Sequence, residues 1–371
     1  MIVQDVINHL HDLAPLNYAE DFDNVGLLVG DKNQTVSGVL VTLDTLEAVV
    51  DEAIENNCNL IVSFHPIIFK GLKKLTGKTY VERVVIKAIQ HNIAIFSIHT
   101  ALDNAFEGVN SIICDQLQLQ NKKILIPQSG TLKKLQTYVP NENAEALRTA
   151  LFNAGAGNIG NYDACSFNLE GKGTYRGNEE SNPTLGQKGE LHTENETLIS
   201  VVFAKHIESK VLKALFGAHP YEEVAYEITT LDNTNHYIGM GMIGELAQEM
   251  EELDCLQYIK ERMNTACVRH SELRGKPVKK IAVLGGSGSF AIGSAKASGA
   301  DLLVTADLKY HDFFSAENSI LLADIGHYES EQFTKSFLVD YLSKKITNFA
   351  AALPAGRVVL SKTNTNPVKY L

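Results

Sequence analysis

Short runs of uninterrupted apolar residues, separated by amphipathic helical segments, most constrain what this chain can fold into. The segments that contain these runs, near the start and near the end of the sequence, are residues 38–44, 59–65, 93–100, 278–289, 301–306 and 319–327. Strands that are apolar throughout are buried on both faces, which is typical of sheets covered by helices on both sides. We therefore predict an α/β fold for both ends of the chain.

The pattern changes near Pro127. From there to about Asn235 glycine and asparagine are frequent, and the expected strands alternate between polar and apolar residues. Helical segments at residues 143–155 and 206–218 separate these strands in the order strand–helix–strand, repeated once. That order is the split βαβ pattern of a ferredoxin-like unit.

A chain of 371 residues is too long for one ordinary core, which favours more than one domain. The simplest organisation is a two-part α/β body formed by residues 1–126 and 236–371. Residues 127–235 are then an inserted ferredoxin-like α+β domain.

Charge and composition exclude several classes of protein. The formal net charge of -11 argues against binding nucleic acid or an anionic membrane, because both need a basic face. No stretch approaches the roughly 20 consecutive apolar residues of a membrane-spanning helix. The first residues lack a basic leader followed by an apolar block, and the five cysteines are scattered without a CxxC pair. We expect a cytoplasmic protein without a disulfide scaffold.

Ionisable residues follow most of the apolar runs. They are Asp44, His65, His99 with Asp103, Asp307 with His311, and His327 with Glu331. In open α/β sheets, ligands bind outside the carboxyl ends of the strands. One such residue alone is ordinarily a capped or solvated group, but their joint occurrence favours a site.

Metal binding is the chemistry that these residues favour. His327 and Glu331 are four residues apart at the expected start of a helix, so both point along one face. Asp103 and His65 would add ligands from neighbouring strand ends. Histidines combined with carboxylates suit Zn, Mn, Fe or Mg, with water in the open positions.

The glycine-rich stretch LGGSGSF, residues 284–290, has two interpretations. It follows an expected strand, as a dinucleotide-binding turn does, but it lacks a complete GxGxxG and the acidic residue that should follow. We therefore favour a tight turn that lets the backbone approach the metal site.

Several motifs, in order along the whole chain, resemble the GTP cyclohydrolase 1 type 2 homologues, also called Nif-three-like proteins. They are AEDFDNVGLLVGD, LIVSFHPIIFKGLKKL, SIHTALDNAFEGVN, KIAVLGGSG, GADLLVTADLKYHD and IGHYESE. The middle of the chain resembles the PII- or CutA-like insertion of the longer members. The resemblance implies a two-metal centre inside a toroidal hexamer.

The resemblance also implies a ligand set and one departure from it. The second of two adjacent family histidines falls on His65, and the other ligands fall on Asp103, His327 and Glu331, with Glu331 as the bridge between ions. The first histidine falls on Phe64, which cannot coordinate a metal. We therefore expect one well-held ion and a second, weakened site, unless His99 or His311 substitutes.

Two classes of function follow from these expectations. The first is a metal-dependent hydrolase that acts on a nucleotide, with GTP as the substrate that the family label suggests, through metal-activated water. His99, His311 and Glu331 are its candidate catalytic residues. The alternative is a non-catalytic, metal-binding regulatory protein whose PII-like insertion senses a small ligand.

Overall fold

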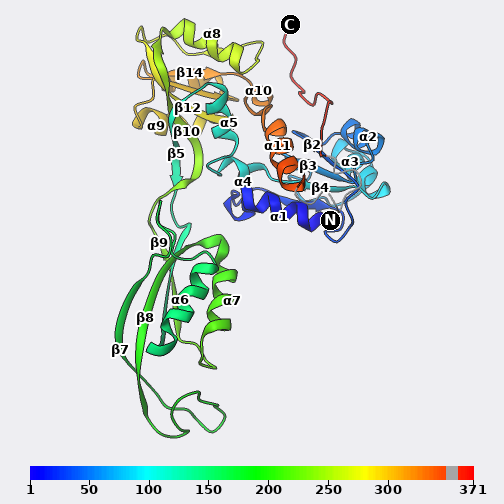
Figure 1. Cartoon of the computed structure of the whole chain (residues 1–371). Coiled ribbons are helices and arrows are strands. Elements are labelled where there is room, and N and C mark those ends of the chain that lie inside the picture. Colours follow the sequence, from blue (N-terminus) through cyan, green and yellow to red (C-terminus); the bar gives the residue numbers. More distant parts are fainter. Residues whose placement is uncertain (348–357) are drawn as a thin grey trace. The chain divides into compact units, whose positions relative to one another are not determined.

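The computed structural model describes residues 1–347 and 358–371, which divide into two compact units (Figure 1). One unit combines Met1–Pro127 with His236–Leu371, and the other is Gln128–Asn235. Helices and sheets are mixed in both, so the predicted α/β class is confirmed.

The first sheet of the larger unit has the strand order β1-β4-β3-β2-β15. These strands are β1 (Gly26–Val29), β4 (Ala94–Ser97), β3 (Leu60–Ser63), β2 (Val39–Thr42) and β15 (Val358–Leu360). All neighbours are parallel except β1, which runs antiparallel to β4.

Helices cover both faces of this sheet, which explains why its strands are apolar throughout. The helices are α1 (Val3–Leu13), α2 (Glu47–Glu55), α3 (Tyr80–Gln90) and α11 (Thr334–Thr347). Along β2, Val39 and Val41 join the core with α1 and α11, whereas Leu40 joins the core with α2 and α3.

The second sheet of the same unit has the order β11-β14-β13-β12-β10-β5. The strands are β5 (Gln120–Gln128), β10 (Asn235–Met250), β11 (Arg269–His270), β12 (Val278–Ser287), β13 (Leu302–Ala306) and β14 (Leu321–Asp324). β12, β13 and β14 are parallel, β10 runs antiparallel to β12, and β11 runs antiparallel to β14. The accompanying helices are α5 (Val109–Gln116), α8 (Glu252–Arg262), α9 (Ile292–Ala297) and α10 (His327–Glu331).

The smaller unit is one antiparallel sheet with the order β7-β8-β6-β9 and two helices (Figure 1). Its elements are β6 (Leu132–Pro140), α6 (Ala144–Asn153), β7 (Phe167–Tyr175), β8 (His192–Ala204), α7 (Glu208–Ala218) and β9 (Tyr226–Leu231). Apolar residues of α6 and α7 pack on one face of the sheet to form a separate core. Its PII- or CutA-like character stays a prediction.

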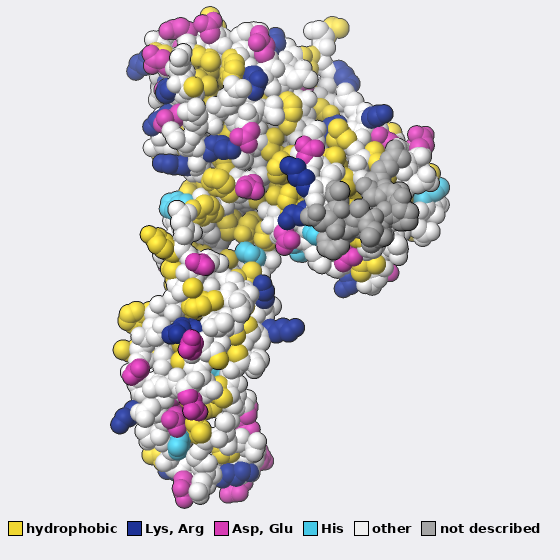
Figure 2. Space-filling view, viewed as in Figure 1, with side chains coloured by type: hydrophobic (Ala, Val, Ile, Leu, Met, Phe, Trp, Pro, Cys, Tyr) yellow, Lys and Arg dark blue, Asp and Glu magenta, His cyan; other side chains and the backbone are white. Residues whose placement is uncertain are grey.

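The surface shown in Figure 2 mixes acidic and basic side chains, with no basic stripe on that face. Nucleic-acid binding requires basic groups gathered along one face. Among residues 1–347 and 358–371, no helix has the length and apolar character needed to cross a bilayer.

We predict that residues 128–235 fold when they are produced alone, because their sheet and core are complete within the segment. Thermal unfolding followed by circular dichroism should show one cooperative transition. Leu147→Ala should destabilise the fragment by about 2–5 kcal/mol, since Leu147 is fully buried. Lys213→Ala, on an exposed position of α7, should change stability by less than about 0.5 kcal/mol. Non-cooperative melting would contradict the prediction.

Candidate metal centre

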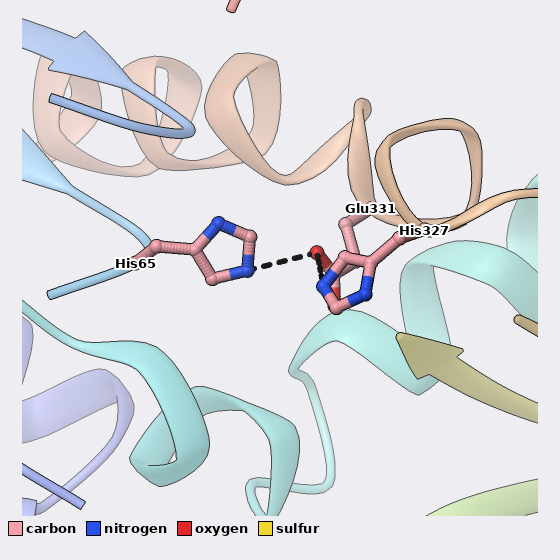
Figure 3. Close-up of side chains that lie close together, drawn as sticks. All are labelled: His65, His327 and Glu331. Atoms are coloured by element: carbon pink, nitrogen blue, oxygen red, sulfur yellow. Dashed lines mark ion pairs between the residues drawn. The ribbon is translucent and has the colours of Figure 1, made fainter. Parts of the chain in front are cut away.

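His65, His327 and Glu331 meet at the carboxyl ends of strands from the two sheets of the larger unit (Figure 3). Each offers one ligand atom, and these atoms all lie within 4.8 Å of one another. Glu331 Oε2 lies between the two rings, 3.1 Å from His65 Nε2 and 3.3 Å from His327 Nε2. Three of the four predicted metal ligands are therefore brought together.

Local sequence explains how each residue reaches this point. β3 ends at Ser63. The hydroxyl of Ser63 donates a hydrogen bond of 2.7 Å to the carbonyl of His65, and this bond fixes the chain just before Pro66. His327 and Glu331 begin and end the short helix α10, so their side chains share a face. Gly326 precedes the helix with a φ of 92°, a conformation that favours glycine.

An aspartate holds each of the two histidines. Asp44 Oδ1 lies 2.8 Å from His65 Nδ1, and Asp307 Oδ2 lies 2.7 Å from His327 Nδ1. A carboxylate on Nδ1 fixes the orientation of the ring and leaves Nε2 as the ligand atom, as in the carboxylate–histidine pairs around metals. Asp44 and Asp307 were singled out in the sequence as strand-end residues, but not in this role.

Unsatisfied buried atoms show that the group fits a cation. Neither His65 Nε2 nor Glu331 Oε2 has an aligned hydrogen-bond partner among the described residues, and neither has Asp103 Oδ1. Buried polar atoms are nearly always paired, because an unpaired one is costly. Nitrogen and oxygen ligands of this kind suit several divalent ions.

Without a metal, protons take the place of the cation. Burial lowers the pKa of His65, but the negative charges of Glu331 and Asp44 outweigh it and raise that pKa to about 10. Burial also lowers the pKa of His327, but its contacts with Glu331 and Asp307 outweigh this effect and raise that pKa to about 9. Burial raises the pKa of Glu331, yet the two histidines bring it down to about 2.

Asp103, the fourth predicted ligand, lies at the end of α4 (His99–Asp103), which follows β4. It is outside the group whose ligand atoms lie within 4.8 Å. Burial and the charge of Glu331 raise the pKa of Asp103 well above its usual range, and His65 and His327 partly oppose this. The charges of the site therefore act on the Asp103 carboxyl group. The role of Asp103 as a metal ligand stays a prediction.

His99, a predicted catalytic candidate, lies beside the ligands, with its ring centroid 5.2 Å from that of His65. Its Nδ1 is 2.8 Å from Asp23 Oδ2, and the amide of Thr100 also donates to Asp23. The backbone φ of His99 is +24°, which is rare outside glycine and is often retained at functional sites. Asp23 was missed as a site residue, because it lies in a loop 76 residues earlier.

The other two residues raised from the sequence have different surroundings. His311 is exposed, and its ring contacts are with Tyr310 and Phe314. Phe64 is fully buried in the core that α1 and α11 share, with its ring centroid 4.9 Å from His65 and 5.5 Å from His99.

The glycine turn at the end of β12 approaches the site, as the sequence predicted. A Cβ on Gly286 would lie 2.6 Å from Glu331 Oε1, and the residue has a φ of +67°. The amide of Gly286 donates a hydrogen bond of 2.9 Å to Ser330 Oγ, which holds the turn against α10. Only glycine leaves room here for the Glu331 carboxylate.

Residues 1–367 match the family described as Duf34/NIF3 (NGG1p interacting factor 3). The chain belongs to this family. The resemblance noted from the motifs is thereby confirmed, including the family's label, since relatives carry the name GTP cyclohydrolase 1 type 2 homolog. The relative from Bacillus subtilis is 37% identical, over 99% of this chain and 98% of its own length. The one from Staphylococcus epidermidis is 33% identical over the whole of both chains.

Solved structures of family proteins have the same fold. A Bacillus cereus protein related to NIF3 superposes with a TM-score of 0.87 at 34% identity, covering 100% of this chain and 99% of its own. The Staphylococcus aureus protein SA1388 gives a TM-score of 0.76 at 31% identity with the same coverage.

Gly286→Ala should weaken divalent metal binding about tenfold or more, because the added methyl group displaces the Glu331 carboxylate. It should also lower the free energy of unfolding by about 1–3 kcal/mol through the strained φ. Isothermal titration calorimetry with Mn²⁺ measures the first effect. Gly293→Ala is the matched control, since nothing lies within 4 Å of its added Cβ. Equal Mn²⁺ affinity in both variants would show that the close approach is unimportant.

Metal binding should release protons and weaken as the pH falls. The metal-free histidines have raised pKa values, about 10 for His65 and about 9 for His327, so both carry protons near neutral pH that a metal must displace. Titrations in buffers of different ionisation enthalpy count the protons released. We expect more than one proton per ion at pH 7, with a lower affinity at pH 6. A proton count of zero would contradict these charge states.

Proposed function

We propose that this protein holds divalent metal ions at His65, His327 and Glu331, with Asp103 as a further ligand, and hydrolyses a nucleotide there. The observation that supports it most is the convergence of three ligand atoms within 4.8 Å, with buried polar atoms left unpaired. The substrate class comes from the label of the relatives, GTP cyclohydrolase 1 type 2 homolog.

The residues around the site have separate roles in the proposed hydrolysis. His65, His327 and Glu331 would hold a divalent ion, which would supply a Lewis acid for activating water and polarising the substrate. Asp44 and Asp307 keep the Nε2 atoms of His65 and His327 directed at the ion. Asp23 occupies Nδ1 of His99, so its Nε2 is the nitrogen that takes or returns a proton beside the ligands.

We also propose that the two ions are held unequally. Phe64 cannot supply the ligand that the family motif has at its position, so one ion is held well and the other weakly. Zn, Fe, Mn and Mg all suit the donor set. By resemblance, the active form is a homo-oligomer, a hexamer, and the scattered cysteines suit a cytoplasmic location.

A regulatory, non-catalytic role is the second candidate, and one observation favours it. The unit Gln128–Asn235 contains a cavity of about 930 Å³. Tyr138, Tyr175 and Tyr221 line it together with the largely buried Glu196, which accepts a 2.8 Å hydrogen bond from Tyr221. A cavity of this size is suitable for a small ligand.

Turnover of GTP with and without added Mn²⁺ separates the two candidates. The hydrolase should be inactive after chelation and regain activity with metal. Asp103→Asn should lower both the ion content, measured by elemental analysis, and the rate, because an amide is a poorer ligand than a carboxylate. Full metal content in this variant would remove Asp103 from the ligand set. Metal binding without turnover of GTP or related nucleotides would favour the regulatory role.

Phe64→His should raise the metal content from near one ion per chain to near two. The ring at position 64 lies 4.9 Å from the His65 ring, so an imidazole there is close to the ligands. It should also lower stability, since a polar ring replaces a fully buried phenyl in the core. Elemental analysis gives the ion count, and Phe64→Leu controls for the loss of the phenyl ring. Two tightly bound ions in the parent protein would mean that Phe64 is not a lost ligand.

A further inference from the structure

A cavity of about 540 Å³ adjoins the candidate metal centre in the larger unit. His65, His327 and their partners Asp44 and Asp307 line one part of it. The other lining residues include Arg269, Asp324, Tyr328 and Glu329, together with residues near the end of the chain, from Asn366 to Val368 and Tyr370. Its volume is within the usual range for small-molecule sites.

The carboxyl-terminal segment is hydrogen-bonded directly to the residues that surround the metal ligands. The hydroxyl of the buried Thr365 donates a 2.6 Å hydrogen bond to Asp44 Oδ2, and the other oxygen of Asp44 holds His65 Nδ1. One residue later, the side-chain amide of Asn366 donates a hydrogen bond of 2.9 Å to Glu329 Oε1. Glu329 belongs to α10, the helix of His327 and Glu331.

We propose that residues 365–370 are a functional part of this site. Thr365 is a positioning residue that orients His65 through Asp44, and the following residues form one wall of a cavity that binds the phosphate group of the substrate. The role of Thr365 concerns metal affinity. The role of the cavity wall rests on the proposed nucleotide hydrolase and names where its substrate binds.

The positioning role follows from the geometry of Asp44. This side chain is about one-third exposed, so without a second partner it can rotate into solvent. The Thr365 hydroxyl fixes one carboxylate oxygen and thereby directs the other to His65. Loss of such an outer partner typically weakens metal binding by about 10- to 100-fold.

The preference for a phosphate follows from the free hydrogen-bonding groups around the cavity. Arg269 Nη2 donates hydrogen bonds to the carbonyl of Leu308 and to Asp324 Oδ2. The Nε and Nη1 atoms of Arg269 have no hydrogen-bond partner within the described parts of the chain. The hydroxyls of Tyr328 and Tyr370 are two further donors, and they too lack partners there. The four carboxylates of the lining, Asp44, Asp307, Asp324 and Glu329, each accept at least one hydrogen bond, so the groups with unused hydrogens are Arg269 and the two tyrosines. Donors beside a cation suit an oxyanion, and arginine suits phosphate in particular.

Mn²⁺ binding to three variants of the full chain tests the positioning role. Thr365→Val keeps the shape but removes the hydroxyl, and it should weaken Mn²⁺ binding about 10- to 100-fold. Thr365→Ser keeps the hydroxyl and should restore the affinity to near that of the parent. Thr363→Val is the matched control, because it removes a 2.7 Å hydrogen bond to Glu52, outside the site.

The outcomes separate this proposal from the proposed function. Failure of the parent to bind Mn²⁺ would contradict the metal site itself. Tight binding by the parent and by Thr365→Val alike would contradict only the positioning role. Equal weakening in Thr363→Val would mean that the segment acts through general stability, which also overturns the proposal.

Binding of GMP, inorganic phosphate, guanosine and citrate to the Mn²⁺-loaded protein tests the cavity. GMP and phosphate should bind, whereas guanosine should bind much more weakly because it lacks the phosphate. Arg269→Ala should weaken GMP binding about 10- to 100-fold with the Mn²⁺ affinity unchanged. Arg83→Ala, which removes an arginine paired with Glu47 outside the cavity, is the control.

Deletion of residues 367–371 should also weaken GMP binding while leaving Thr365 in place. Equal binding of guanosine and GMP, or an Arg269→Ala variant that binds like the parent, would overturn the phosphate assignment. Citrate binding as tight as that of GMP would show a general carboxylate site instead. GMP binding without any GTP turnover would contradict the hydrolase and leave the phosphate site intact.

Discussion

The buried carboxylate of Glu331 between two imidazole rings is the interaction on which the larger unit depends. Its side chain is almost completely buried, and an isolated charge there would cost several kcal/mol. The compensating histidines come from the ends of different sheets, since His65 follows β3 and His327 follows β14. A small change in how the two sheets pack would therefore alter the charge balance at Glu331. The fold and the site thus depend on each other.

The surroundings of this pair contain more negative than positive groups. The carboxylates are Asp23, Asp44, Asp103, Asp307 and Glu331, and the histidines that face them are His65, His99 and His327. The five carboxylates outnumber the three imidazoles, so a net negative charge remains even if all three imidazoles carry protons, and a proton on Asp103 reduces this excess without removing it. A divalent cation would reduce this excess and would give the unpaired atoms of His65, Asp103 and Glu331 a partner. The electrostatics thus agree with the ligand geometry.

Sequence patterns predicted the elements and most of the site, but not its supporting hydrogen bonds. The apolar runs located β2, β3 and β4, and the rule that ligands bind at strand ends selected His65, His327 and Glu331. No local pattern shows that Thr365 reaches Asp44 across 321 residues, or that Asp23 reaches His99 across 76. Such contacts depend on how separate elements pack, which periodicity within one element does not encode.

At the strand end, the adjacent residues 64 and 65 belong to different parts of the structure, one to the hydrophobic core and the other to the site. Neighbouring side chains at the end of a strand project to opposite sides. Phe64 thus enters the hydrophobic core while His65 faces Glu331. A histidine at position 64 would have to turn out of that core to reach an ion beside the rings of His65 and His99, whose centroids lie 4.9 and 5.5 Å from that of Phe64. Phe64 therefore favours packing over ligation, and His99, held by Asp23, is the polar group that remains beside it at the site.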